Sequence, residues 1–359
     1  MKTKIALAGL GLAMALSGCH SIGPGSVARD RFDYSSSLGE SWKRQTLLNI
    51  VKLRYLDPPI FVDVGQIVSG YTLQTTASAG GGVNWPSAGT AAGSLALGAQ
   101  GQYTDRPTVT YTPLTGNKFI KGLMTPLPPD SVFFTIQSGW PADGVLFATV
   151  SEINGLKNQG TSVSGVTPPD PGFMRVLQLM RKIQLSGAVA MRIRQDSASQ
   201  ETTLLTFRSK DISPETLADI HELRQLLRLD PDAEDIKLVF GSNPTNDREV
   251  AMITRSMMQQ MATMASQVEV PAEDVSQGRA TPGWETMTNG VSAPRLLKVY
   301  SSKDAPKDAF VAIPYRNSWY WIDDRDLKSK RTFSFMMLLF TLADTGEKEP
   351  LPLVTIPAQ

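Results

Sequence analysis

The chain has 359 residues, and its 35 Lys and Arg residues nearly balance its 34 Asp and Glu residues. This near-neutral charge gives no global field for nucleic acid, so we expect no nucleic-acid partner. A single cysteine excludes an internal disulfide framework. A chain of this length is ample for one or two hydrophobic cores and has to be held together by ordinary packing.

Residues 1–18 have the features of a bacterial lipoprotein signal peptide. Lys2 and Lys4 precede an uncharged run at 5–16, which is too short for a permanent transmembrane helix and has the length of a signal-peptide hydrophobic region. The run ends in Leu-Ser-Gly-Cys at 16–19. A buried cysteine behind an N-terminal core helix is the alternative, and it would require all these features to coincide. We therefore expect the mature chain to begin at Cys19, carrying a diacylglycerol and an acyl chain and no other cofactor.

The residue after the cysteine bears on the destination of a lipoprotein. His20 stands there, and not the aspartate that tends to retain lipoproteins at the inner membrane. We therefore expect a chain anchored by lipid in the outer membrane, with its body in the periplasm. Residues 19–40 are polar and rich in Ser and Gly, which predicts a lipidated flexible tether.

The second notable segment, 66–106, is almost free of charge. No Asp, Glu, Lys or Arg occurs between Asp63 and Asp105, a run of 41 residues. Odd positions are apolar or small and even positions polar or small, which is the period of a β-strand and not of a helix. The segment therefore predicts a long two-stranded β-hairpin inserted into the chain.

The tip of this hairpin is expected near Ser87. Folding the segment there sets Tyr71 opposite Tyr103 and Ala77 opposite Leu97. Strands of eleven residues, 73–83 and 91–101, tilted by about 45°, would rise roughly 26 Å, close to the apolar band of an outer-membrane barrel.

Three interpretations of the hairpin remain open: a membrane-inserted hairpin, a hairpin packed on another protein, and a flexible Gly/Ala/Ser-rich loop. A lone hairpin cannot cross a bilayer, because its edges would leave backbone amides unpaired. Insertion would therefore need at least about four copies in a homo-oligomeric β-barrel. Under this interpretation the lipid-facing residues are Tyr71, Leu73, Val83, Trp85, Leu95, Leu97 and Tyr103, and the lumen-facing residues are Thr72, Gln74, Thr76, Gln100 and Gln102.

The remaining segments, 41–65 and 107–359, predict an α+β body. Helices are expected at 41–55, 116–124, after Pro128-Pro129 with Asp130 as cap, and at 173–183, 214–228, 247–266 and 332–343. Strands are expected at 60–64, 107–113, 145–153, 188–195, 202–208, 236–240, 311–314 and 319–322, and a loop at 159–171.

Three stretches carry a resemblance: RQTLLNIVKLRYLDPPIF at 44–61, RPTVTYTPL at 106–114, and WYWIDDRDLKSKRTFSFMMLLFTLADTG at 319–346. They resemble a set of proteobacterial outer-membrane lipoproteins of unassigned function, which implies no catalytic residue. A lipid-anchored ring with one hairpin per chain would be similar in architecture to the curli secretion channel, without any of its sequence motifs.

Nothing in the sequence predicts an enzyme. His221 has no second histidine at ligand spacing, and no nucleophile or phosphate-binding motif occurs in a convincing context. The acidic residues Asp323, Asp324 and Asp326 alternate with basic ones, which favours a salt-bridge cluster and helix cap over a cation site. We expect no metal and no catalytic residue.

Two functions follow as hypotheses. The first is an outer-membrane lipoprotein that homo-oligomerises through its periplasmic body and donates one hairpin per chain to a pore or export channel. The alternative is a periplasmic scaffold lipoprotein whose hairpin docks on a partner protein of an envelope or secretion machine. A lipid-anchored enzyme comes third, because no catalytic constellation supports it.

Overall fold

The computed structural model describes residues 27–343, apart from 69, 85–91, 163–164, 196–200, 209–211, 282 and 284–294. The fold is mixed α+β, which confirms the predicted class. The chain divides into two compact units: residues 60–114 form the smaller one, and the segments before and after it form the larger one. We call the larger unit the body and the smaller one the ribbon.

The body begins with α2 (Val27–Arg54), a helix much longer than the one expected at 41–55. From residue 27 on, the prediction of a flexible tether is wrong. Ser35, Ser36, Ser37 and Gly39 give this stretch a linker-like composition, yet all four are helical. Composition misleads here because the low helix propensity of Ser and Gly is only a weak indication of local structure. The buried side chains of α2 lie only in its last third, at Thr46, Leu47, Asn49, Ile50, Val51 and Arg54.

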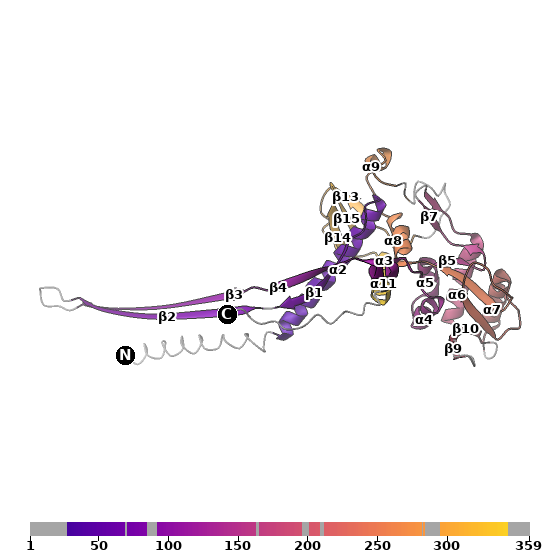
Figure 1. The fold of residues 1–359 in the computed structure, drawn as a ribbon, viewed down its shortest axis with the longest axis horizontal. Helices are drawn as coiled ribbons and strands as arrows, with labels where there is room; N and C mark the ends of the chain where they lie inside the picture. The colour runs from indigo at the N-terminus through magenta and orange to yellow at the C-terminus, as the bar shows by residue number, and fades with distance from the viewer. Residues whose placement is uncertain are drawn as a thin grey trace. The chain divides into compact units, whose positions relative to one another are not determined.

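A six-stranded sheet forms one part of the body (Figure 1), in the order β6 (Leu156–Lys157), β5 (Val150–Ile153), β12 (Glu249–Thr254), β11 (Asp235–Phe240), β10 (Glu201–Phe207) and β9 (Val189–Gln195). All neighbours are antiparallel except β11 and β12. These two run parallel although only residues 241–248 connect them, a shorter link than the crossover that usually joins parallel strands.

Two predicted elements of this region are wrong in part. Residues 145–153 were expected as a strand, but α5 (Ala142–Thr149) is helical and only β5 follows it. A single helix was expected at 247–266, but the segment divides into β12 and α8 (Met257–Ala265). Both segments are mostly buried on all sides, and there periodicity does not distinguish helix from strand. Ser256 caps α8, and its side chain accepts a hydrogen bond from the Gln259 amide at 3.2 Å.

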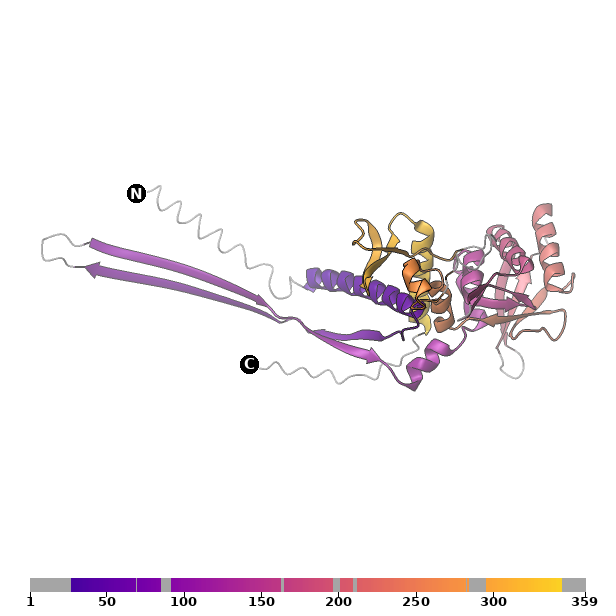
Figure 2. The ribbon, with the colours of Figure 1, turned by 90° about the horizontal axis from the view of Figure 1, so that it is seen from above.

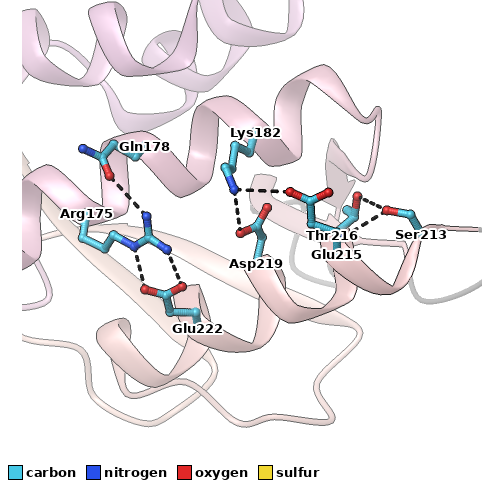
Figure 3. A network of polar contacts seen from close by, with 8 residues as sticks. All are labelled: Arg175, Gln178, Lys182, Ser213, Glu215, Thr216, Asp219 and Glu222. Atoms are coloured by element: carbon cyan, nitrogen blue, oxygen red, sulfur yellow. Dashed lines mark hydrogen bonds and ion pairs between the residues drawn. The ribbon is translucent and has the colours of Figure 1, made fainter.

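Helices α6 (Pro171–Leu185) and α7 (Pro214–Leu227) pack against each other, near their predicted bounds. Figure 3 shows the polar contacts between them. Arg175 makes two hydrogen bonds of 2.6 Å to the carboxylate of Glu222, and Lys182 lies 3.4 Å from Asp219. Each partner favours the charged form of the other, so the pKa of Glu222 is lowered and that of Arg175 is raised. As predicted, Ser213 caps α7, accepting from the Thr216 amide.

A second sheet has three strands, in the order β13 (Tyr300–Ser302), β15 (Ser318–Asp323) and β14 (Ala309–Tyr315). Strands β14 and β15 form the expected hairpin. Helix α2 packs against β14 and α8, and α11 (Leu327–Ala343) against β15 and α8. α11 begins five residues before the predicted start at 332, because Asp326 caps it by accepting from the Ser329 amide at 3.0 Å.

Shorter elements complete the body. Helices α3 (Asn117–Met124) and α4 (Pro129–Gln137) occupy their predicted places, with Asp130 inside α4 and Pro128 at its cap. The expected loop at 159–171 contains a small strand pair, β7 (Gly160–Ser162) and β8 (Gly165–Thr167). The remaining helix is α9 (Ala272–Ser276).

The core of the body holds a buried arginine whose guanidinium is bound by backbone carbonyl oxygens. Arg255 is 3% exposed and donates to the carbonyl oxygens of Phe147 at 2.9 Å, Ala148 at 3.2 Å and Gln159 at 2.5 Å. Burial lowers its pKa to about 10. These bonds tie the end of β12 to α5 and to the segment before β7.

The ribbon consists of β1 (Phe61–Val68), β2 (Tyr71–Asn84), β3 (Ala92–Asp105) and β4 (Thr108–Leu114). β1 pairs with β4 and β2 with β3, both antiparallel. Figures 1 and 2 both show β2 and β3 side by side along their whole length.

Candidate functional site

The two strand pairs of the ribbon share one register. Gln66 lies opposite Thr110 in the β1–β4 pair, and Tyr71 opposite Asp105 in the β2–β3 pair, which is the same pairing frame. Between them the amide of Arg106 donates to the carbonyl of Gly70 at 3.0 Å. The ribbon is therefore one continuous two-stranded structure from Phe61 to its tip, and β2 and β3 are its outer part.

One irregularity interrupts this register near the base. The pairing shifts between Val64 and Gln66, and Gly65 is the extra residue. A Cβ at Gly65 would meet the Thr112 hydroxyl at 3.2 Å, so the close approach favours glycine. From Phe61 to Asn84 the ribbon is roughly 80 Å long at about 3.3 Å per residue.

The predicted hairpin exists, but its register differs from the expectation. Leu73 lies opposite Tyr103 and Ala77 opposite Ala99, where the sequence suggested Gly101 and Leu97. The described pairs, out to Asn84 opposite Ala92, are therefore centred one position later in the sequence than a fold about Ser87 would give. An odd position still pairs with an odd one, so the division into two faces is retained. Large-to-small matching selected the wrong frame because Gly and Ala alternate on both strands and match about equally well in either frame.

The positions predicted to face water are exposed. Thr72, Gln74 and Thr76 on β2, and Gln100 and Gln102 on β3, all lie on the even face with exposed side chains. The predicted lipid-facing positions Tyr71, Leu73, Val83, Leu95, Leu97 and Tyr103 belong to the odd face by register. Their side chains, and Trp85 as a whole, lie outside the described part of the structure.

The edges of the ribbon are open. Within the described residues β2 pairs only with β3, so each strand has a second edge whose backbone donors and acceptors face no other strand. Such an edge is a template for pairing with another chain. The hairpin thus offers two edges, each 14 residues long and free of charge up to the terminal Asp105, for assembly.

The lipidation site and the acidic cluster have different outcomes. Cys19 and residues 1–18 lie outside the described residues. At 323–331 the acidic side chains are engaged by their neighbours: Asp323 with Arg325 at 3.3 Å, and Asp324 with Lys330 at 2.7 Å, while Asp326 caps α11. Among the described residues no group of three His, Cys, Asp or Glu has the arrangement of a metal site. His221 lies exposed on α7.

The sequence did not indicate a polar network inside the body. The hydroxyl of Tyr55 donates to Asp274 at 2.7 Å and lies 2.6 Å from the hydroxyl of Tyr320. An ionised carboxylate only accepts, so the proton of Tyr55 is directed to Asp274 and Tyr320 donates to Tyr55. Burial raises the pKa of both tyrosines. Sequence separations of 219 and 265 residues conceal this network from sequence reading.

Tyr320 and Asp274 also line a polar cavity of about 720 Å³ between α9, β13 and the β14–β15 turn. Arg279 lies 3.5 Å from Asp274, and Arg316 lies 3.3 Å from Asp57. The guanidinium of Arg316 also stacks on the ring of Tyr55, 4.4 Å from its centre. Most of the charged residues that line this cavity form ion pairs within the protein. The residues around it therefore serve chiefly to connect the end of α2 with α9 and β15.

Comparison with known protein-family models, with curated proteins and with solved structures finds no match for this chain. Of the helices that the structure describes, none combines the length and the apolar character needed to cross a bilayer. Arguments about function therefore depend on the geometry above.

Proposed function

We propose that this chain is an outer-membrane-anchored lipoprotein that homo-oligomerises and donates one β-hairpin per copy to a pore or export channel. The observation that carries the proposal is the outer ribbon: two strands of 14 residues whose only charged residue is the terminal Asp105, exposed and polar on one face, with both outer edges unpaired among the described residues. A strand of 9–11 residues suffices to span an outer membrane at the usual tilt.

Open edges make oligomerisation a requirement of this proposal. In hydrocarbon each unpaired backbone group costs several kcal/mol. Pairing β2 of one copy with β3 of the next satisfies both edges at once and closes a ring. The even face, with Thr72, Gln74, Thr76, Gln100 and Gln102, would then line a water-filled interior, as in outer-membrane barrels.

The experiment is single-particle cryo-electron microscopy of the full-length acylated protein extracted in mild detergent. The proposal expects a ring with a β-barrel, built from residues 71–84 and 92–105 of each copy, crossing the micelle. A monomer, or a ring whose hairpins stay outside the micelle, would overturn it.

One observation favours a second candidate, a periplasmic scaffold whose ribbon docks on a partner protein. The whole ribbon, at roughly 80 Å, is longer than a bilayer requires. The strand pair β1–β4, which carries Asp63, would remain outside the membrane in either case. Under this alternative the open edges pair with the edge of a sheet in the partner protein. After removal of the lipid, extraction without detergent would then yield a soluble complex of the two proteins.

A further inference from the structure

Most side chains in the first half of α2 are exposed, although Asp30, Tyr34 and Glu40 are partly covered. Among residues 27–42, Phe32 is 76% exposed, Val27 62%, Trp42 37% and Leu38 36%. Every buried side chain of the helix lies at or after Thr46. We refer to residues 27–42 as the exposed half of α2.

A helix in this situation needs support from outside. Three serines and a glycine at 35–39 are weak helix formers, and most helical stability in proteins comes from packing of one face. The ion pairs near its end, from Glu40 to Lys43 at 2.5 Å and to Arg44 at 3.2 Å, stabilise only one turn. A helix segment with little packing on its own chain is stabilised when another surface covers its exposed apolar side chains.

We propose that the exposed half of α2 packs against the same segment of a second copy of this chain. The inference depends on the proposed acylated oligomer. Only residues 20–26 separate Cys19 from Val27, a span of at most about 25 Å. Acylation of Cys19 would therefore hold the start of every α2 near the same bilayer, so that neighbouring copies present these helices in parallel and at the same height.

The side chains of the exposed half fit a ring of like copies. Val27, Leu38 and Trp42 fall within about 60° of one side of the helix, at 100° per residue. Phe32 lies on another side, and in a ring every copy has two neighbours. The charged residues have both signs, Arg29 and Arg31 with Asp30, Asp33 and Glu40, so like copies do not repel. This slight acidic excess does not suit a surface of anionic lipid.

Photo-crosslinking of the full-length acylated protein in outer-membrane preparations tests the inference. p-Benzoylphenylalanine is placed at Phe32 or Trp42, and at Leu185 as the control, because Leu185 is 70% exposed at the end of α6. We expect adducts with twice the mass of the 39.0 kDa chain, which mass spectrometry identifies as two copies joined within residues 27–42. These adducts should be at least ten-fold more abundant than those formed with the crosslinker at Leu185. Adducts to lipid or to another protein, or no enrichment over the control, would overturn it.

A second variant tests the same surface without a crosslinker. Phe32→Ser with Trp42→Ser is expected to shift dissociation of the oligomer to at least ten-fold higher protein concentration. The unfolding midpoint of the dissociated full-length chain should stay close to that of the parent, since neither side chain is buried; Leu185→Ser should change neither quantity. The two proposals fail in different ways. Crosslinks between copies of α2, with hairpins outside the micelle, would reject the pore and keep this contact. A barrel in the micelle without such crosslinks would keep the pore and reject this contact.

Discussion

Tyr55, next to the end of α2, and Tyr320, in the central strand of the three-stranded sheet, place their hydroxyl oxygens 2.6 Å apart, and both side chains are buried. The rings meet edge to face at a centroid distance of 6.4 Å. Through Tyr55 the pair also reaches Asp274 near α9. One short chain of hydroxyls therefore connects three elements that are far apart in sequence.

This connection predicts a loss of stability at high pH. Both tyrosines have their pKa raised by burial, so the folded state keeps them neutral above pH 10, where an unfolded tyrosine ionises. Stability from this source is fully present below about pH 10 and falls as pH rises above it, by up to about 1.4 kcal/mol per pH unit for each tyrosine.

The measurement is urea unfolding between pH 8 and 11, with Tyr55→Phe and Tyr320→Phe as comparisons. Each variant should lose about 1–3 kcal/mol at pH 8, because a buried partner is left unsatisfied, and should show a shallower decline than the parent above pH 10. Comparison between variants is needed because the pKa of Arg54 and of Arg255 is lowered to about 10, so these groups make the free energy of unfolding rise with pH where the tyrosines make it fall. Parallel pH curves for parent and variants would contradict the prediction.

Arg255→Met is expected to destabilise the body by about 3 kcal/mol or more. The substitution removes the guanidinium donor from the buried carbonyl oxygens of Ala148 and Gln159, and each group left unsatisfied costs about 1–3 kcal/mol; the Phe147 carbonyl keeps the Asn158 amide as a donor. Thermal unfolding measures the effect. Arg325→Met is the matched control, since that side chain is 80% exposed, and it should leave the midpoint unchanged. Equal midpoints for both variants would refute the structural role of Arg255.

The register of the hairpin is tested by disulfides. Ala77→Cys with Ala99→Cys places two cysteines directly opposite, at a Cα separation of about 4.5–5.5 Å that suits a disulfide. Ala77→Cys with Leu97→Cys joins diagonal positions about 7–8 Å apart and should oxidise poorly. Mass spectrometry after mild oxidation distinguishes the pairs. Preferential oxidation of the second pair would restore the register expected from sequence.

Membrane insertion is tested by charge on the two faces. Leu97→Lys puts a charge on the odd face and should prevent insertion, at roughly 2–4 kcal/mol per site near the midplane. Gln100→Lys puts the same charge on the exposed even face of the same strand and should be tolerated. The measurement is the fraction of chain that resists alkaline extraction from membranes. Equal resistance of both variants would speak for a hairpin docked on protein.

How much the sequence revealed depended on the kind of signal. Alternation over residues 71–103 predicted the hairpin, and the cap at Ser213 with the buried Ile220 and Leu223 predicted α7, because these are local patterns. Buried segments such as β12 were misassigned, since a strand covered on both faces shows no clear alternation. The first half of α2 was missed because Ser and Gly made it look like a linker, and the Tyr55–Asp274 contact because nothing local encodes it.

The bulge at Gly65 acts on the whole ribbon, and not only on its base. Gly- and Ala-rich strands hold their alignment weakly, and a slip by two residues would keep every position on its face. The shifted pair between Val64 and Gln66 sets the pairing frame from the end nearest the body, and the continuous register carries it outward to Asn84 and Ala92. Strand alignment is therefore set before the tip is reached. Chains with a longer or shorter connection between Asn84 and Ala92 can retain the same ladder.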